Sequence, residues 1–302
     1  MNKGLEKNKG LLDIIKDRLG LKSNTKAREV IKSGRVKLDD ETVKIPSQLV
    51  GENQKVSIED RKKVNKSKTS TTKSFKGFTT LYEDDNYLAF VKPSGLLSVG
   101  TLKNKKNEKN FFNFAQRQFK EENGPDADLF IINRLDRLAS GIVLFAKSPD
   151  AEVAIRRSWD DSKKRYYALV EGTPKNEKGE IQSELKQNRI GRVYSVPKSN
   201  YSKLCITNYR ILHKSEKFSL LKIEAVAERK NSIRAHLSEN GWPIAGDKDY
   251  KGSPSPIHRF GLHLFSLSFY HPFKKEVIEI KTPIPQAFKG YFKKNKNKKP
   301  AN

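Results

Sequence analysis

The apolar positions near the start of the chain recur with helical spacing. One face of a helix predicted over residues 11–19 carries Leu11, Leu12, Ile14, Ile15 and Leu19. The same spacing resumes after Ser23, a residue type that caps helix N-termini, and ends at Gly34. Alternating positions in "RVKLDDETVKI" and "VGENQKVSIED" then predict short strands joined by turns. The pattern predicts a small unit of two helices and a hairpin over residues 10–60.

Strand patterns dominate the rest of the chain, over residues 77–290. They occur in "LYEDDNYLAFVKP", "IVLFAKS", "RYYALVEG", "KLCITNYRILHK", "FSLLKIEAV" and "EVIEIKTP". Helical spacing occurs between them in "NEKNFFNFAQRQFK", "PDAEVAIRRSWD" and "NSIRAHLSEN". This order predicts an α+β fold: a mixed, mainly antiparallel sheet with flanking helices, preceded by the small N-terminal unit.

Three segments are almost free of apolar residues and rich in lysine. Residues 61–76 have the composition of a flexible basic linker, which places a domain boundary there. The segment 103–110 is predicted to be an exposed loop of the second domain. Residues 291–302 are predicted to be a basic disordered tail.

The charge of the chain favours a polyanionic partner. With 61 Lys and Arg against 35 Asp and Glu, the formal net charge is +26 over 302 residues. Self-repulsion of this size destabilises a compact fold unless an anion lies against it, so nucleic acid is the first partner to consider. No apolar run reaches the roughly 18 residues that a membrane span needs, and the polar start lacks a signal-peptide core. We therefore expect a cytoplasmic protein without a membrane partner, monomeric by default.

Cysteine and histidine usage excludes some chemistry. The single cysteine, Cys205, cannot form an internal disulfide, and its apolar surroundings predict a buried thiol. The five histidines form no cluster with ligand spacing. We expect no metal, and we interpret His263 and His271 as structural.

Asp136 is the first candidate for chemistry. It lies in "IINRLDRLASGIVLFAK" (131–147), in a predicted turn before an apolar strand, and Gly141 permits close backbone approach. A carboxylate in a partly dry pocket stays ionised when a guanidinium lies beside it, and can then act as a nucleophile. From the residues alone a structural Asp–Arg pair remains the stronger interpretation.

The motif around Asp136 resembles that of a known enzyme family. "NRLDRLASG" is similar to the active-site signature H-R-L-D-x-x-T-S-G of the RluA-type pseudouridine synthases. Four more blocks between residues 80 and 285 follow in the family's order. "LYEDDNYLAFVKPSGLLS" resembles the opening block that ends N-K-P-x-G, and "KKRYYALVEG" resembles K-x-Y-x-A-x-V-x-G. "ERKNSIRAHLSENGWPIAGDKDY" resembles G-R-x-H-Q-I-R-x-H-L followed by G-x-P-I-x-G-D-x-x-Y, and "GLHLFSLSFYHP" resembles L-H-A-x-x-L-x-F-x-H-P.

This resemblance implies an enzyme that isomerises uridine in RNA to its C-glycoside without a cofactor. Asp136 would be the nucleophile, attacking either the ribose or the uracil, and Arg234 its basic partner. Tyr166 would pack on the flipped uracil and assist proton removal, with Tyr167 as the adjacent competitor. Without the resemblance, Tyr166 would be interpreted as a core aromatic and Arg234 as a surface base. The expected RNA contacts of this domain are Arg134, Arg137, Arg229 and Lys92.

The N-terminal unit resembles the αL RNA-binding module first described in a small-subunit ribosomal protein. The resemblance lies in "IKSGRVKLDDETVKI", which matches a second helix ending I-K-S-G-x-V. It implies phosphate contacts by Lys22, Lys26, Arg28 and Arg35. Family members often carry Ser-Arg where this chain has Ser23-Asn24. An ordinary basic subdomain is the alternative.

Several positions depart from the family pattern. Asn133 replaces its His, Ala139 its Thr, Val91 its Asn, and Asn231-Ser232 its His-Gln pair. Loss of these groups could change how the extruded base is held. The alternative function is therefore a catalytically inactive RNA-binding or ribosome-assembly factor. For the enzyme, we expect large-subunit ribosomal RNA as the substrate, with tRNA as the alternative.

Overall fold

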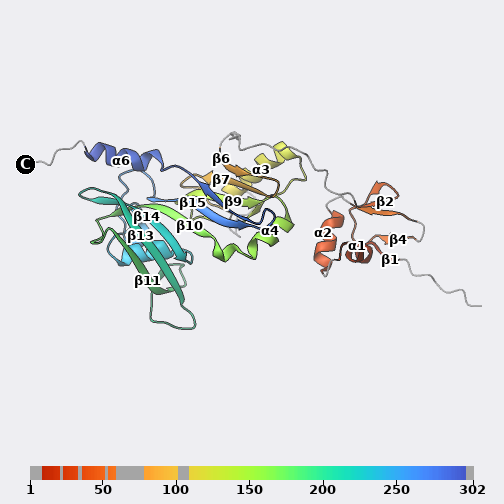
Figure 1. Ribbon diagram of the computed structural model, residues 1–302, viewed down its shortest axis with the longest axis horizontal. Coiled ribbons are helices and arrows are strands. Elements are labelled where there is room, and N and C mark those ends of the chain that lie inside the picture. Colours follow the sequence, from red (N-terminus) through yellow and green to blue (C-terminus); the bar gives the residue numbers. More distant parts are fainter. Residues whose placement is uncertain are drawn as a thin grey trace, which may run out of the picture. The chain divides into compact units, whose positions relative to one another are not determined.

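The computed structural model describes residues 9–20, 23–32, 36–51, 54–58, 78–100 and 109–296 (Figure 1). The predicted linker at 61–76 lies outside these residues, as do 101–108 and 297–302. The chain divides into two compact units, Met1–Thr69 and Ser70–Asn302.

The first unit contains the two predicted helices and a set of short strands. Its elements are β1 (Lys9–Gly10), α1 (Leu11–Leu19), α2 (Asn24–Lys32), β2 (Val36–Leu38), β3 (Glu41–Thr42), β4 (Leu49–Val50) and β5 (Val56–Ile58). β1 pairs with β4, and β2 lies between β3 and β5. Asp39 and Asp40 form the turn from β2 to β3 with positive φ angles, a conformation that Asp tolerates better than most residues. The apolar helix faces pack on the strands through a core of Leu11, Ile15, Ala27, Ile31, Val36, Leu38, Val50 and Val56.

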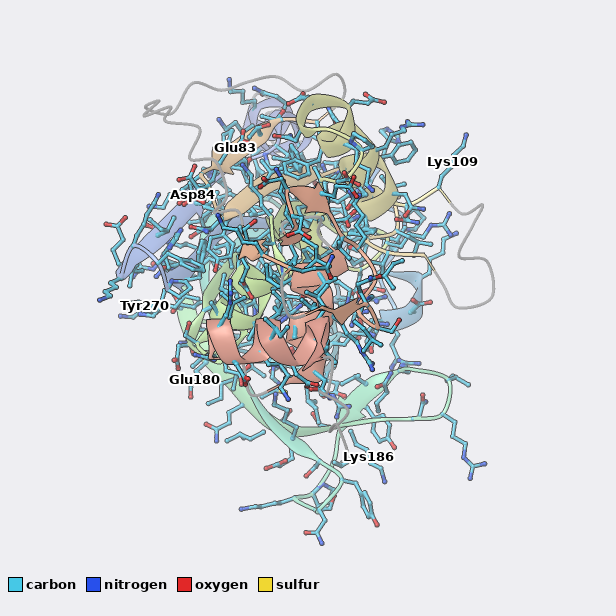
Figure 2. All side chains as sticks on the ribbon, turned by 90° about the vertical axis from the view of Figure 1, so that its right-hand side faces the viewer. Glu83, Asp84, Lys109, Glu180, Lys186 and Tyr270 are labelled. Atoms are coloured by element: carbon cyan, nitrogen blue, oxygen red, sulfur yellow. The ribbon has the colours of Figure 1, made fainter. Side chains whose placement is uncertain are left out.

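The second unit is built on an 11-stranded mixed sheet, with the strand order β12-β11-β13-β14-β10-β15-β9-β7-β6 and with β16 and β8 added on β15 and β9. Its strands are β6 (Thr80–Glu83), β7 (Tyr87–Lys92), β8 (Phe130–Ile131), β9 (Ser140–Ala146), β10 (Lys163–Glu171), β11 (Lys178–Gln187), β12 (Val193–Ser195), β13 (Lys203–Lys214), β14 (Phe218–Ala227), β15 (Leu262–His271) and β16 (Glu276–Lys281). Every pairing is antiparallel except that of β15 with β9. Figure 2 labels Glu180 and Lys186 near the two ends of β11.

In the described part of this unit, four α-helices cover the two faces of the sheet. They are α3 (Phe111–Asn123), α4 (Pro149–Arg156), α5 (Ser232–Glu239) and α6 (Gln286–Lys296). α4 and α5 pack into one core cluster, which also contains Tyr166, Ala168 and Val170 of β10. α3 and α6 pack into two other clusters, and the α6 cluster contains Leu169 of the same strand. Because side chains alternate along a strand, Tyr166 and Tyr167 lie on opposite faces of the sheet.

α6 continues past residue 290, where the sequence analysis ended the catalytic domain. The helix reaches Lys296, and Phe292 is buried beside Phe288 against Leu169 and Leu220. The prediction of a disordered tail is therefore wrong for residues 291–296. The burial of Phe292 gives the physical reason, because it removes a large apolar side chain from water.

The junction of β9 with β15 places the loop of Asp136 beside the middle of the sheet. The parallel register pairs Ser140 with His263 and Gly141 with Leu264. Gly141 has a φ of 129°, and a Cβ atom there would lie 2.3 Å from the carbonyl oxygen of Leu264. The predicted close backbone approach at Gly141 is confirmed, since only glycine fits this contact.

Candidate active site

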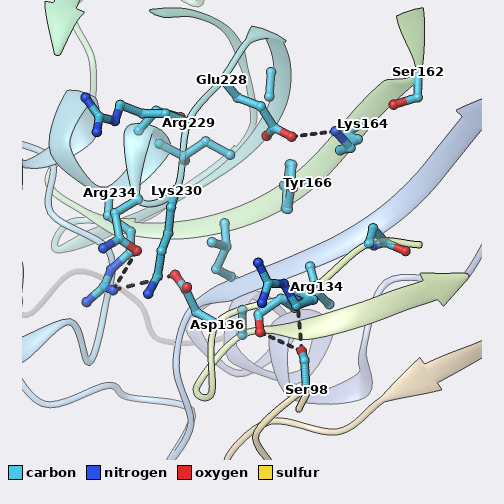
Figure 3. A pocket seen from close by; sticks show the side chains of 18 of the residues that line it. Ser98, Arg134, Asp136, Ser162, Lys164, Tyr166, Glu228, Arg229, Lys230 and Arg234 are labelled. Atoms are coloured by element: carbon cyan, nitrogen blue, oxygen red, sulfur yellow. Dashed lines mark hydrogen bonds and ion pairs between the residues drawn. The ribbon is translucent and has the colours of Figure 1, made fainter. Parts of the chain in front are cut away.

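A cavity of about 1050 Å³ opens on the α5 face of the second unit. Its lining comes from the loop before β9, from β10, from the end of β14 and from the start of α5. Asp136, Tyr166 and Arg234 all lie in it, although they are far apart in the sequence (Figure 3). The predicted RNA contacts Arg134, Arg137 and Arg229 line it as well.

Arg234 points its guanidinium at the carboxylate of Asp136. Nη1 of Arg234 lies 3.5 Å from Oδ2 of Asp136. The Arg234 side chain is only 9% exposed and that of Asp136 is 24% exposed, so both groups are partly withdrawn from water. An ion pair in such a position is screened less than one at the surface. The pair thus combines a largely buried cation with an accessible carboxylate.

The guanidinium itself is fixed by Asp247. Nε and Nη2 of Arg234 donate to the two carboxylate oxygens of Asp247 at 2.7 and 2.6 Å. Nη2 also donates to Asp249 at 3.0 Å, and the guanidinium carbon lies 4.7 Å from the ring centre of Tyr250. Burial alone lowers the pKa of Arg234, but its bonds to Asp247 outweigh that effect and raise it above the usual value. Asp247 therefore holds Arg234 in one charged orientation.

No role was predicted from the sequence for Asp247 in "GDKDY" (246–250). The signal that could have found it is the letter D that the family block G-x-P-I-x-G-D-x-x-Y specifies at this position. Asp247 is fully buried, and a buried carboxylate needs a charged or multiply bonded partner.

A second loop braces the turn that carries Asp136. Ser98 Oγ donates to the carbonyl of Leu135 at 2.7 Å and accepts from its amide at 3.0 Å. The amide of Gly95 donates to the carbonyl of Arg137 at 2.9 Å, and Nε of Arg137 donates to the carbonyl of Gly95 at 3.2 Å. These bonds fix the backbone on both sides of Asp136 and leave its carboxylate facing the cavity.

The prediction that Lys92 contacts RNA is wrong. Lys92 is fully buried, and its ammonium donates to the carbonyls of Pro93, Leu96 and Arg137 at 2.9, 2.6 and 3.2 Å. Burial lowers the pKa of Lys92 to about 8, and the nearby negative charge of Asp136 opposes this shift only in part. The carbonyls of Pro93 and Leu96 belong to the loop that contains Ser98, and that of Arg137 belongs to the Asp136 turn. Lys92 therefore positions this turn.

Tyr166 lies between the two ends of the cavity. Its side chain is largely buried, and burial raises the pKa of its hydroxyl well above the usual value, with further contributions from Glu228 and Asp136. Its hydroxyl makes no hydrogen bond to any residue that the structure describes. Tyr167 faces the other side of the sheet, where its ring stacks on Phe265 with centres 3.9 Å apart. Only Tyr166 of the two competitors can reach a ligand in the cavity.

Charged residues around the cavity rim include several that sequence reasoning missed. Arg134 and Arg137 are exposed, whereas Arg229 is half-buried and donates to the carbonyl of Leu185 at 2.7 Å. The missed residues are Asp160, Lys164, Lys203, Glu228 and Lys230. For Lys164 the available signal was the first letter of K-x-Y-x-A-x-V-x-G.

Two of the departures from the family pattern have structural roles here. Asn133 is buried; its Nδ2 donates to the carbonyl of Ile142 at 3.0 Å, and its Oδ1 accepts from the amide of Leu144 at 2.8 Å. Asn231 adopts a left-handed conformation at the start of α5 and accepts a bond from Nη1 of Arg234 at 3.2 Å. Both asparagines therefore hold the segments that carry Asp136 and Arg234.

The two histidines expected to be structural are buried within hydrogen-bonded pairs. Nδ1 of His263 lies 2.7 Å from Oγ of Ser140, and Nε2 of His271 lies 2.7 Å from Oδ2 of Asp84. Burial, with a contribution from Arg259, lowers the pKa of His263 to about 3, so its ring is neutral. Neither histidine lines the cavity.

In the N-terminal unit, Arg28 is exposed on α2. Lys26 lies in the same helix, and its side chain is outside the described part of the structure, as are Lys22 and Arg35 entirely. Across the residues that the structure describes, no group of three His, Cys, Asp or Glu side chains could hold a metal ion. In the same residues no helix is long and apolar enough to cross a bilayer.

Comparison with known proteins identifies the fold and the family. The RNA pseudouridylate synthase family model matches residues 86–239, more than half of the chain, and the S4 domain model matches residues 10–56. The "Dual-specificity RNA pseudouridine synthase RluA" of Vibrio parahaemolyticus is 30% identical over 209 residues, which cover 64% of this chain and 77% of that protein. An "Uncharacterized RNA pseudouridine synthase" of Aquifex aeolicus is 26% identical over 89% of this chain and 88% of its own length. The solved structure of human RNA Pseudouridylate Synthase Domain Containing 4 covers 74% of this chain and 94% of its own, with a TM-score of 0.58 and 19% identity, which supports the fold alone.

The mixed sheet, the S4 unit and the cavity around Asp136 thus define an RNA-modifying enzyme of the pseudouridine synthase fold. The chain belongs to the RNA pseudouridylate synthase family, and it is an RNA uridine isomerase. Enzymes of this family need no cofactor. The predicted α+β fold and the predicted family are confirmed, and the comparisons give no support to the inactive alternative.

Proposed function

We propose that the cavity isomerises specific uridines of large-subunit ribosomal RNA, with Asp136 as the nucleophile. The observation that carries the proposal is the Asp136 carboxylate, which faces the cavity at 3.5 Å from the fixed guanidinium of Arg234. Ribosomal RNA is supported by the "Ribosomal large subunit pseudouridine synthase C" of Rickettsia bellii, which is 30% identical over 179 residues, 56% of each chain. The enzyme acts in the cytoplasm as a monomer; light scattering during size-exclusion chromatography tests the monomer.

Two reaction routes satisfy this arrangement. Asp136 attacks C1′ of the ribose, and N1 of the uracil leaves with the bonding electrons; alternatively, Asp136 adds to C6 of the ring before the C1′–N1 bond breaks. In both routes the base turns until C5 faces C1′, and a C1′–C5 bond forms. The bond from Asp136 to C1′ or to C6 breaks and returns the free carboxylate, C5 loses its proton, and N1 gains one. The isomerisation balances without a co-reactant. Arg234 holds the Asp136 carboxylate in place for the attack.

Tyr166 supports the base while it is detached. Its ring offers an apolar surface on which a uracil can pack, and its hydroxyl is free to accept a hydrogen bond. Because burial raises the pKa of Tyr166, the phenol stays protonated at neutral pH and can donate as well. Tyr166 therefore assists removal of the C5 proton through its protonated hydroxyl, by passing a proton along a hydrogen bond, and not as a phenolate.

The rim cations hold the RNA while one nucleotide leaves its stack. Extrusion of a base costs a few kcal/mol, which phosphate contacts elsewhere must offset. Arg134, Arg137 and Arg229 supply such contacts beside the cavity. Lys22, Lys26, Arg28 and Arg35 of the S4 domain supply further phosphate contacts, which raise affinity without selecting a base.

The proposal is tested with purified protein and transcribed large-subunit ribosomal RNA. Asp136→Asn keeps the size of the side chain but removes the nucleophile, so pseudouridine formation should fall by about 10⁴-fold or more, as when other covalent nucleophiles are removed. RNA affinity should stay near the wild-type value. Asp160→Asn removes an exposed carboxylate from the rim of the same cavity and should retain activity. Activity of Asp136→Asn close to wild type would refute the assignment, and wild-type activity on tRNA transcripts alone would move the substrate to tRNA.

A further inference from the structure

The cavity extends well beyond the group formed by Asp136 and Arg234. Figure 3 shows Asp136 and Arg234 toward one end, Tyr166 in the middle, and Lys164, Ser162 and Glu228 toward the other. Lys164 precedes Tyr166 by two residues on β10 and lies on the same face, so their Cα atoms are about 7 Å apart. When the target uridine packs on Tyr166, the next nucleotide of the RNA can therefore reach the Lys164 end of the cavity.

This second end contains an ion pair between β10 and the residue that follows β14. Nζ of Lys164 donates to Oε1 of Glu228 at 2.6 Å, with side chains 15% and 30% exposed. Among the residues that the structure describes, Oε2 of Glu228 has no hydrogen-bond partner. The pair thus leaves one acceptor oxygen at the cavity wall.

Glu228 is a further departure from the family pattern. "ERKNSIRAHL" aligns with G-R-x-H-Q-I-R-x-H-L, so Glu228 stands where that pattern has Gly. Glycine offers no side chain to a ligand, whereas Glu228 adds an acceptor-only group to a cavity that binds a polyanion. This chain has therefore gained a group that the pattern lacks.

A carboxylate in an RNA site selects strongly for what lies beside it. A phosphate oxygen there is repelled, and so are the carbonyl oxygens of uracil. An exocyclic amino group of adenine, cytosine or guanine can instead donate to the free oxygen, as cytosine N4 does to Glu or Asp in other complexes. Lys164 neutralises part of the charge of Glu228. The carboxylate can therefore accept a hydrogen bond from a base without strongly repelling the neighbouring phosphates of the RNA.

We propose that Glu228 recognises the exocyclic amino group of a nucleotide adjacent to the target uridine. The pair of Glu228 and Lys164 is then a specificity subsite, which favours amino-bearing bases beside the modified position and disfavours uridine there. This inference rests on the proposed function, because it takes Asp136 as the centre at which the target uridine binds.

The test uses a pool of stem-loop RNAs with one loop uridine and randomised nucleotides on both sides. Pseudouridine formed by the wild type, by Glu228→Gly and by Glu228→Gln is located by chemical marking and sequencing. We expect the wild type to favour amino-bearing bases on one side by about 10-fold over uridine, the value of one hydrogen bond to a charged group. Both variants should lose this preference on that side only.

Analogue RNAs separate the base from the ribose. If adenine or guanine is preferred, purine riboside or inosine removes only its exocyclic amino group, and kcat/KM of the wild type should fall about 10-fold. A 2′-deoxy substitution at the same nucleotide should change little. Loss of activity with the 2′-deoxy RNA but not with the base analogue would overturn the proposal, because Glu228 would then accept from a 2′-hydroxyl.

The matched control is Glu224→Gln, which breaks another ion pair between the same two strands. Oε2 of Glu224 lies 2.9 Å from Nε of Arg165, and neither residue lines the cavity. If Glu228 only joined the strands, both glutamine variants would lower thermal stability alike and neither would change base preference. That result overturns the subsite. A wild type that modifies no RNA of the pool or of total ribosomal RNA would instead refute the proposed function itself.

Discussion

The loop that carries Asp136 and the helix that carries Arg234 meet across the cavity, but different chemistry holds each of them. The loop is braced by neutral backbone bonds, by Ser98 and by the ammonium of Lys92, whose pKa burial lowers to about 8. The guanidinium is held by the buried carboxylate of Asp247, which raises the pKa of Arg234. The bracing of the Asp136 loop should therefore weaken at alkaline pH, whereas the anchoring of Arg234 should not change.

Removing the carboxylate that anchors Arg234 should have the largest effect. Asp247→Ala leaves a buried guanidinium without its bidentate partner, which should cost about 3–5 kcal/mol of unfolding free energy. The displaced Arg234 no longer orients Asp136, so kcat/KM should fall by about 100-fold or more. Chemical denaturation and single-turnover assays measure the two effects.

Asp249→Ala is the control for this variant. Asp249 also contacts Nη2 of Arg234, but its side chain is 76% exposed, so its loss should cost about 0–1 kcal/mol. Equal effects of the two alanine variants would contradict the assignment of Asp247 as the anchor.

Removing the ammonium of Lys92, which braces the Asp136 loop, should have an intermediate effect. Lys92→Met keeps the length of the side chain but loses three bonds to carbonyls, and a loss of about one net hydrogen bond in the transition state lowers kcat about tenfold. The wild type should lose activity as pH rises through about 8, since a neutral amine holds the carbonyls less strongly. Lys92→Met should lack this decline. An identical alkaline decline in both proteins would assign it to another group.

As pH rises, the stability of the wild type relative to Lys92→Met should change in the opposite direction to its activity. The pKa of Lys92 is lowered on folding from 10.5 to about 8, so the unfolded chain binds more protons between these values. The unfolding free energy of the wild type should therefore rise relative to Lys92→Met as pH increases from about 8 toward 10.5. Urea denaturation at several pH values measures the difference, and a fall across this range would contradict the buried-lysine account.

Restoring the family residue at position 133 should have a smaller effect. The side chain of Asn133 both donates to and accepts from the backbone of β9, and an imidazole cannot reproduce both bonds in the same geometry. Asn133→His should lower the unfolding free energy by about 1–3 kcal/mol, the cost of a buried group left unpaired. Thermal unfolding measures it; a gain in both stability and activity would show that Asn133 only replaces the histidine poorly.

The smallest effect should come from the rim. Arg134 is exposed, so Arg134→Gln should weaken RNA binding for all sequences alike and reduce the slope of log affinity against log salt by about 1. Filter binding at several salt concentrations measures this slope. A change in base preference would contradict a contact with phosphate alone.

The sequence predicted the parts of the site that depend on local pattern and family resemblance. Asp136, Tyr166 and Arg234 come from three separate blocks, and the structure brings them to one cavity. The choice between Tyr166 and Tyr167 follows from strand alternation once the core faces are known. The small unit of two helices also follows from its apolar spacing.

The residue roles that the sequence could not predict depend on partners that come together only in the folded chain. Lys92 in "FVKPSG" has the pattern of an exposed base, but its partners are three backbone carbonyls brought together by the fold. The lysines of the last segment concealed α6, whose stability comes from Phe288 and Phe292 packing on a distant strand. The role of Asp247 could not be predicted because its partner lies 13 positions earlier, on another element.

The central claim is that Asp136 converts uridine to pseudouridine in ribosomal RNA. Its most direct test is a pseudouridine map of total RNA from cells that lack the protein, complemented with the wild type or with Asp136→Ala. The account predicts that at least one site in large-subunit ribosomal RNA disappears in the deletion strain and returns only with the wild type. A site that also returns with Asp136→Ala, or a map that is the same in every strain, would contradict it.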